Sequence, residues 1–170
     1  MILRKTNLNN IPSIMAIISD AQSYLKSLGI DQWQDGYPDE AQISLDIKNE
    51  DSYVISNDDN QVMGTVVFTT SPESTYDKID GEWKTKSNDP YGVIHRLAVS
   101  NNYRGVGIAK FVFEFCERQL KEMGVQSMRI DTHRDNKGMQ QLILGLGYEY
   151  CGVIILNSGA ERLAYEKLIV

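Results

Sequence analysis

The stretch IHRLAVSNNYRGVGIAKFVF, residues 94–113, contains the pattern that decides the fold. An apolar run over residues 93–99 predicts a central β-strand, and a glycine-containing turn follows it. A helix is predicted over residues 105–123, because five residues fall on one apolar stripe: Ala109, Val112, Cys116, Leu120 and Met123. Free N–H groups at the start of a helix bind anions such as phosphates. The order of strand, glycine turn and helix therefore predicts a phosphate-binding site.

Two common phosphate-binding patterns fit this turn poorly. A P-loop needs a lysine and a hydroxyl residue directly after its last glycine, but Gly107 is followed by Ile108. A dinucleotide-binding GxGxxG pattern could begin at Gly105, and Asp131 at the end of a later predicted strand would suit its ribose-binding acid. However, Lys110 takes the place of the third glycine, where the helix must pack closely on the strand. A dinucleotide-binding oxidoreductase is therefore the weaker alternative.

Periodicity elsewhere predicts a mixed α/β domain spanning residues 1–170. Apolar residues at helical spacing predict a helix over residues 11–28, capped by Asn10 and ended by Gly29, and a shorter helix after Pro38. The segment 71–89 has no clear period and is expected to be an ordered functional loop. The other predicted elements are strands at 53–56, 62–69, 128–133, 148–156 and 162–168, and a helix at 136–146.

The composition limits the class of protein. With 42% hydrophobic and 24% charged residues, it is ordinary for a soluble globular chain. No apolar run approaches the ~20 residues of a membrane span and no export signal is visible, so we expect a cytoplasmic protein without a membrane partner. A net charge of −6 argues against a nucleic-acid partner. Cys116 and Cys151 lack a CxxC spacing and are expected to be buried, reduced thiols.

The turn resembles the coenzyme A pyrophosphate loop of the GNAT superfamily of N-acetyltransferases. Residues 104–109, RGVGIA, follow its pattern Gln/Arg-x-x-Gly-x-Gly/Ala. A turn that merely joins a strand to a helix would explain these six residues alone. The resemblance extends further, because Asn136 follows the next predicted strand and Gly147-Tyr148 ends the next helix, as in that family.

The resemblance implies a fold and an activity. The expected fold is a single-domain GNAT-like α/β fold, whose mixed and mostly antiparallel sheet carries helices on both faces and has splayed central strands. The expected activity is acetyl-CoA-dependent transfer of an acetyl group directly to a primary amine of a small molecule, peptide or protein. Acetyl-CoA is the cosubstrate, and no metal is expected because the two histidines lack a second ligand cluster. A homodimer through the terminal strands is compatible with this fold class.

The same match assigns residues to the cofactor. Backbone groups of the strand are expected to bond the pantetheine arm, namely those of Leu97, Ala98 and Val99. The N–H of Leu97 is also expected to polarise the thioester carbonyl as a catalytic group, since a fixed donor stabilises a developing oxyanion. Asn136 is expected to contact the coenzyme arm. The pyrophosphate is expected on the turn, formed by Arg104, Gly105, Val106, Gly107, Ile108 and Ala109.

His95 is the candidate catalytic base. Only a neutral amine can attack the thioester, and an imidazole with a pKa near ~6.5 suits removal of the proton. Strict strand alternation places His95 on one face with Leu97. A core histidine bonded to the backbone is the alternative explanation. His133 and Asp131 could extend a proton relay or orient the amine, but a structural Asp–His pair is the favoured account of their spacing.

The acceptor side is expected to contain aromatic residues from polar loops. Trp33, Tyr37, Trp83 and His133 are predicted to bind the acceptor, although aromatic residues also attach long loops to a core. Ile143 stands where many GNAT enzymes carry a tyrosine that protonates the leaving thiolate. This departure supports an alternative function, that of a non-catalytic CoA-binding regulatory module with the same fold. The sequence does not identify the acceptor amine.

Overall fold

A computed structural model describes residues 1–86 and 88–170 and divides them into two compact units. The first unit comprises residues 1–68 and 95–115, and the second comprises residues 69–94 and 116–170. Three elements contribute to both units: β3 (Val62–Thr69), by its last residue only, β5 (Gly92–Val99) and α3 (Ile108–Glu122). The described residues form eight strands and four α-helices in a mixed, mostly antiparallel α/β arrangement, which confirms the predicted fold class.

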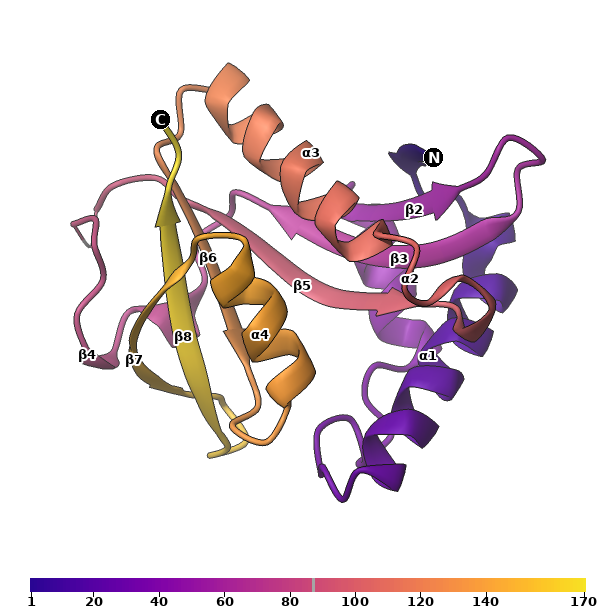
Figure 1. Ribbon diagram of the computed structural model, residues 1–170, viewed down its shortest axis with the longest axis horizontal. Helices are drawn as coiled ribbons and strands as arrows, with labels where there is room; N and C mark the ends of the chain where they lie inside the picture. The colour runs from indigo at the N-terminus through magenta and orange to yellow at the C-terminus, as the bar shows by residue number, and fades with distance from the viewer. Residues whose placement is uncertain (87) are drawn as a thin grey trace. The chain divides into compact units, whose positions relative to one another are not determined.

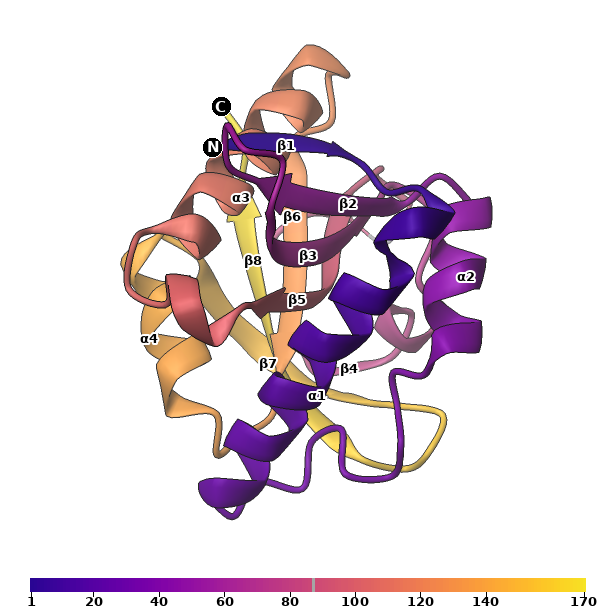
Figure 2. The ribbon, with the colours of Figure 1, turned by 90° about the vertical axis from the view of Figure 1, so that its right-hand side faces the viewer.

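The sheet of the first unit has the strand order β1-β2-β3-β5. Figure 2 shows these strands side by side, in the order β1 (Ile2–Lys5), β2 (Ser52–Ser56), β3 (Val62–Thr69) and β5. The β1–β2 and β2–β3 pairs are antiparallel, with Leu3 opposite Ile55 and Tyr53 opposite Val66. Strand β1 was not predicted, because a four-residue edge strand is too short to show a period.

Helices cover both faces of this sheet. On one face, α1 (Ile11–Ser27) and α2 (Glu40–Lys48) enclose a core cluster of Ile14, Ile17, Ile18, Ile43, Val54 and Ala98. On the other face, Tyr53 packs against Phe115 of α3 with ring centroids 6.3 Å apart. Successive residues of a strand point to opposite faces, and Val54 and Tyr53 accordingly meet different helices. The predicted arrangement of helices on both faces is therefore confirmed within this unit.

The predicted helix ends are largely correct. Gly29 has a φ of 71° directly after α1, the left-handed conformation that commonly ends a helix. Asn10 precedes α1 but makes no capping hydrogen bond to it. Instead, the side chains of Asn7 and Asn10 form a reciprocal capping box around a short 3₁₀ helix, η1 (Leu8–Asn10). The predicted cap is therefore wrong, because a turn of 3₁₀ helix occupies the residues before α1.

The second unit has the strand order β5-β6-β8-β7-β4. Its elements are β4 (Ile79–Gly81), β6 (Ser127–Thr132), α4 (Lys137–Gly145), β7 (Glu149–Ile155) and β8 (Glu161–Leu168). The β5–β6 ladder is parallel and lies at the start of both strands, with Gly92 opposite Met128, whereas the other ladders are antiparallel. Figure 1 shows β4, β7 and β8 side by side. The predicted splay of the central strands beyond this ladder stays a prediction.

The described residues of the segment before β5 pack on one face of the second sheet, while residue 87 of the predicted loop lies outside the described residues. The segment contains a 3₁₀ turn, η2 (Ser74–Tyr76), and the unpredicted strand β4, which pairs with β7. A side chain on Gly81 would collide with the backbone carbonyl of Cys151, so this pairing requires glycine. The core on this face contains Tyr76, Tyr91, Val93, Ile154 and Ala164. On the opposite face, Leu120 of α3 packs directly on Gly92.

Candidate functional site

The glycine turn of the first unit leaves its backbone open. It follows a short 3₁₀ turn, η3 (Asn101–Tyr103), and leads into α3. Gly105 and Gly107 have φ values of 79° and 86°, and a Cβ atom at either position would meet no atom within 4 Å. Residues 104–107 are exposed, whereas Ile108 is buried and anchors the helix start. Exposed N–H groups and the positive end of the helix dipole together favour an anion here.

An unpredicted residue holds the arginine of this turn. The guanidinium of Arg104 lies over the ring of Tyr24 on α1, 4.0 Å from the ring centroid. A cation–π contact at an exposed site contributes about 0.5–1 kcal/mol and restricts where the guanidinium lies. Tyr24 is 48% exposed, so the contact leaves the charge accessible to a ligand. Tyr24 belongs to the polar face of α1, and the sequence contains no signal that pairs it with Arg104.

Strand β5 contains a left-handed residue where the sequence predicts regular alternation. Arg96 has a φ of 52°, a conformation that a non-glycine residue adopts at a cost of roughly 1–2 kcal/mol. It lies between His95 and Leu97, the two predicted catalytic residues. Alternation does not hold through such a residue, so the expected common face of His95 and Leu97 no longer follows from spacing. The imidazole of His95 is partly buried, with Nε2 shielded from solvent.

The side chain of Arg96 makes a clamp with two other elements. Its Nε and Nη2 donate to the two carboxylate oxygens of Asp46 on α2, at 2.8 and 2.7 Å. Its Nη1 donates to the hydroxyl of Tyr37 at 2.5 Å. Asp46 is only 4% exposed and also accepts from Gln42 at 2.9 Å. Asp46 was not predicted, although a carboxylate three residues after Ile43 on the apolar face of a helix is a usable signal.

Two predicted acceptor-binding residues lie in the loop between α1 and α2. Trp33 is partly buried against the core cluster of the first unit, with a φ of 63°. Tyr37 is 38% exposed, and its carbonyl oxygen accepts a hydrogen bond from Gln22 of α1 at 3.0 Å. The structure therefore brings Tyr37 to β5 through Arg96 and packs Trp33 against the core cluster. Their roles toward an acceptor stay predictions.

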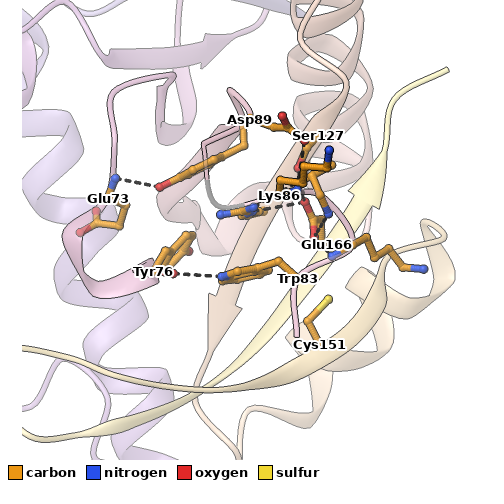
Figure 3. A network of polar contacts seen from close by, with 12 residues as sticks. Glu73, Tyr76, Trp83, Lys86, Asp89, Ser127, Cys151 and Glu166 are labelled. Atoms are coloured by element: carbon orange, nitrogen blue, oxygen red, sulfur yellow. Dashed lines mark hydrogen bonds and ion pairs between the residues drawn. The ribbon is translucent and has the colours of Figure 1, made fainter. Parts of the chain in front are cut away.

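Trp83, predicted to line the acceptor side, belongs to a polar network in the second unit (Figure 3). Its Nε1 donates to the carbonyl oxygen of Tyr76 at 3.0 Å. Its ring lies 4.3 Å from the guanidinium of Arg129, which also lies 4.0 Å from the ring centroid of Tyr91. These contacts attach the segment before β5 to the sheet. They support the alternative explanation, in which this aromatic residue fastens a long loop.

Glu166 is the central acceptor of that network (Figure 3). It is fully buried and accepts hydrogen bonds from the backbone of Lys84 and from the hydroxyls of Thr85 and Ser127. It also pairs with Arg129, which is 1% exposed, at 3.2 Å. Burial alone would raise the pKa of Glu166, but the hydrogen bonds from Ser127 and Thr85 outweigh it and lower that pKa. The network therefore holds a buried charge pair and fixes the loop that carries Trp83.

The residues predicted around β6 have local partners. The hydroxyl of Tyr76 donates to Asp131 at 2.8 Å, and burial followed by the charge of Asp131 raises the Tyr76 pKa well above its usual value. Nδ1 of His133 accepts from the backbone of Asp135 at 3.1 Å. The side chain of Asn136 caps α4 by accepting from the backbone of Met139 at 3.2 Å. Asn136 thus opens α4 as predicted, while its contact with a coenzyme stays a prediction.

Ile143 and the two tyrosines that follow α4 have different surroundings. Ile143 is fully buried on the apolar side of α4, so this position contributes to the core. The neighbouring Tyr148 is 2% exposed and donates to Glu117 at 3.0 Å. Burial, followed by the charge of Glu117, raises the pKa of Tyr148. Tyr148 is therefore a structural tyrosine of the second unit, whereas Tyr150 is 55% exposed and packs edge-on against Tyr165.

The described residues lack a metal-ion cluster and a membrane-spanning helix. Across residues 1–86 and 88–170, no group of three or more His, Cys, Asp or Glu side chains is arranged to hold a metal ion. Within the same part of the chain, no helix has the length and apolar character needed to cross a membrane.

Comparisons with known proteins give the family. A structure described as an acetyltransferase of the GNAT family from Streptococcus agalactiae 2603 is 35% identical, with a TM-score of 0.87 over 98% of this chain and 94% of that one. A ribosomal-protein-alanine N-acetyltransferase from Brucella melitensis is 16% identical, with a TM-score of 0.68 over 99% of both chains.

A phosphinothricin acetyltransferase from Sinorhizobium meliloti, solved in complex with AcCoA, is also 16% identical, with a TM-score of 0.67 over 99% of this chain and 88% of that one. A comparison with curated protein sequences gave no match. The family model described as "Acetyltransferase (GNAT) family" matches residues 14–148. The chain therefore belongs to the GNAT family of acetyltransferases.

Proposed function

We propose that this protein is an N-acetyltransferase that moves an acetyl group from acetyl-CoA directly to a primary amine of a small molecule, peptide or protein. Both units would then belong to one acetyltransferase domain over residues 1–170. The observation that carries the proposal is the open turn at the start of α3, where Gly105 and Gly107 are left-handed and exposed. Membership of the GNAT family supports acetyl-CoA as the donor.

The turn suits a pyrophosphate for three reasons. The backbone of residues 104–109 is not covered by side chains at its two glycines, so phosphate oxygens could approach its N–H groups. The guanidinium of Arg104 lies beside it on Tyr24 and supplies positive charge. The first turn of α3 contains Lys110 and no carboxylate, so no negative charge of that turn opposes an anion. Ile108 and Ala109 provide the first N–H groups of the helix.

The proposed reaction needs few protein groups. The nitrogen of the neutral amine attacks the thioester carbonyl carbon, a C–N bond forms, the C–S bond breaks, and the CoA thiolate leaves. In our proposal, the N–H of Leu97 stabilises the developing oxyanion, while backbone groups of Ala98 and Val99 bind the pantetheine arm. His95 accepts the proton that the amine must lose. Asn136 contacts the coenzyme arm, and Trp33, Tyr37 and His133 line the acceptor side, whereas Trp83 fastens the loop before β5.

Binding of the donor is tested first. Acetyl-CoA should raise the Tm of the protein, because a ligand that binds only the folded state stabilises it, whereas NAD should leave the Tm unchanged. A stabilising effect of NAD without one of acetyl-CoA would restore the dinucleotide alternative. No effect of acetyl-CoA at millimolar concentration would contradict the proposed function.

Turnover is tested next by release of the CoA thiol with a panel of amines. The panel should include spermidine, tyramine, phosphinothricin and a peptide with a free N-terminal alanine, each at several concentrations. The last two represent the substrates printed in the names of two related folds. Acetylation of one amine, confirmed by mass spectrometry of the product, supports the enzyme.

The role of His95 is tested by the pH profile of the best amine. His95→Gln keeps a polar side chain but cannot accept the proton, and His95→Ala removes it. In the wild type, kcat/KM should fall at acidic pH, and both variants should lose that acid limb of the profile. A profile that keeps its shape and height in both variants would show that another group or water removes the proton.

A non-catalytic CoA-binding module is the second candidate function. The observation that favours it is Ile143, which is fully buried where many GNAT enzymes present a tyrosine hydroxyl. Tight binding of acetyl-CoA without acetylation of any amine in the panel would support the module. Coenzyme A thiolate is a tolerable leaving group, since a thiol pKa near ~8.5 makes its anion accessible. A missing tyrosine is therefore compatible with catalysis.

A further inference from the structure

We infer that Arg96 is a positioning residue, whose guanidinium is clamped by Asp46 and Tyr37. The clamp thereby holds the left-handed bend of β5 at Arg96, here called the bulge, which presents the N–H of Leu97. The inference rests on the proposed function, because only an acetyl donor gives that N–H a carbonyl to polarise. Arg96 is not proposed to touch the reacting atoms. It would act through the backbone that follows it.

The backbone of β5 needs to be held at this point. Arg96 has a φ of 52° inside a strand, and arginine has no intrinsic preference for that region. Such conformations persist where the surrounding contacts determine them, and they gather at functional sites. A left-handed residue rotates the next peptide unit out of the regular ladder. The direction in which the N–H of Leu97 points therefore depends on the conformation of its neighbour.

The contacts of Arg96 are of the kind that fix a backbone. Two parallel hydrogen bonds join its Nε and Nη2 to the two carboxylate oxygens of Asp46. A bidentate arginine–carboxylate pair fixes orientation as well as distance, and lysine cannot reproduce it. The side chains of Arg96 and Asp46 are only 14% and 5% exposed, so water competes little for these bonds. Gln42 holds the carboxylate from the same helix at 2.9 Å.

The third contact joins the bulge to the loop that carries the predicted acceptor residues. The Arg96 Nη1 atom donates to the hydroxyl of Tyr37, whose ring centroid lies 5.9 Å from the guanidinium. Tyr37 is itself held on α1 by Gln22. One side chain therefore links the strand that would present the oxyanion donor to the loop that would receive the amine. A shift of that loop would be transmitted to the strand through Arg96.

The test follows the NMR signal of the Leu97 amide directly and does not require the acceptor amine. In ¹⁵N-labelled protein, acetyl-CoA should shift the amide resonances of Gly105 and Gly107, which report the pyrophosphate turn, and that of Leu97. CoA without the acetyl group should shift the glycines but move Leu97 much less. All three amides belong to the first unit, and the experiment separates binding at the turn from contact with the acetyl group.

The variants separate the clamp from the fold. Arg96→Ala, Arg96→Lys and Asp46→Asn should lose the acetyl-dependent shift of Leu97, while the two glycine amides still respond to acetyl-CoA. Where an amine is turned over, kcat should fall about 10- to 100-fold with little change in the Kd of acetyl-CoA. Arg96→Gly adopts the positive φ easily but lacks the guanidinium, and it should fail in the same way.

Arg4→Ala is the matched control in the same unit. Arg4 donates to the side chains of Asn10 and Asn60, both at 3.1 Å, and belongs to no part of the proposed site. This variant should keep the Leu97 response and the wild-type kcat. Tyr37→Phe removes only the third contact, and it should raise the KM for the amine while keeping most of the Leu97 response.

The outcomes distinguish this inference from the proposed function. If acetyl-CoA shifts no amide of the wild type, the proposed function fails and the inference fails with it. If the glycines respond but Leu97 does not, or if Leu97 responds equally in Arg96→Ala and Asp46→Asn, the function stands and the inference is wrong. A normal response in Arg96→Gly alone would show that the backbone conformation suffices without the clamp, and this also overturns the inference.

Discussion

Replacing Glu166 with glutamine should cost the protein about 3–5 kcal/mol of unfolding free energy, the usual cost of removing one partner from a buried ion pair. The change keeps the size of the side chain but removes its charge. It leaves the guanidinium of Arg129, which is 1% exposed, inside the second unit without a counter-ion. The amide also presents one acceptor oxygen in place of two. It therefore cannot accept both from the Ser127 and Thr85 hydroxyls, which bond Oε1, and from the backbone of Lys84, which bonds Oε2.

Urea unfolding measures the expected loss of unfolding free energy. In a chain of 170 residues, each kcal/mol corresponds to roughly 2–4 °C in Tm, so we expect a Tm lower by roughly 6–20 °C. Fluorescence of Trp83 reports the affected unit, because its ring lies 4.3 Å from the Arg129 guanidinium. Glu149→Gln is the matched control, since Glu149 pairs with Lys84 at 2.7 Å but is 68% exposed. Exposed pairs contribute little to stability.

A second substitution tests whether the uncompensated charge is the cause. Glu166→Gln combined with Arg129→Met removes both charges, so it should be more stable than Glu166→Gln alone. If Glu166→Gln destabilises the protein no more than Glu149→Gln does, the buried pair contributes nothing and our reasoning is refuted. If the double variant is the less stable of the two, the packing of Arg129 between Trp83 and Tyr91 outweighs its charge.

Three further predictions follow from single positions. Hydrogen bonds lower the folded-state pKa of Glu166, so the ionised side chain stabilises the fold above about pH 4.5. This stabilisation is lost as the pH falls through the folded-state pKa. Glu166→Gln should flatten this part of an acid-unfolding curve followed by fluorescence. Gly107→Ala meets no clash but forces alanine to a φ of 86°, at a cost of roughly 1–2 kcal/mol. It should weaken acetyl-CoA binding, measured by calorimetry, by about 5- to 30-fold. An unchanged Kd would contradict the role of the turn. Gly92→Ala places a Cβ 2.6 Å from Leu120 Cδ2 and should lower the free energy of unfolding by about 1–3 kcal/mol. Adding Leu120→Ala to the same chain should partly relieve this clash. A wild-type Tm for Gly92→Ala would show that α3 shifts freely.

The sequence predicted those features whose causes are local. The helical stripe of α1, the strand before the glycine turn and the turn itself depend on neighbouring residues, and all three are confirmed. Strands β1 and β4 have four and three residues and owe their conformation to remote partners in β2 and β7. The few residues of such a short strand do not reveal which remote strand it pairs with.

The candidate site was less predictable, because its contacts join distant segments. Alternation correctly indicated a strand around His95 but could not show that Arg96 is left-handed, since a bulge leaves no period. The bond from Arg96 to Asp46 spans 50 residues, and that from Trp83 to Tyr76 depends on a loop without periodicity. The aromatic character of that loop was visible in the sequence. Its attachment to a buried charge pair was not.

The two cysteines determine how cleanly the proposed activity can be measured. Cys116 is fully buried, and burial followed by the charge of Glu117 raises its pKa well above the usual value of a thiol. Burial and Glu166 likewise raise the pKa of the partly buried Cys151. Since only the thiolate reacts quickly with disulfide reagents, both side chains should be slow to react near pH 8. A colorimetric thiol reagent would therefore report coenzyme A released by turnover against a low background from the protein itself.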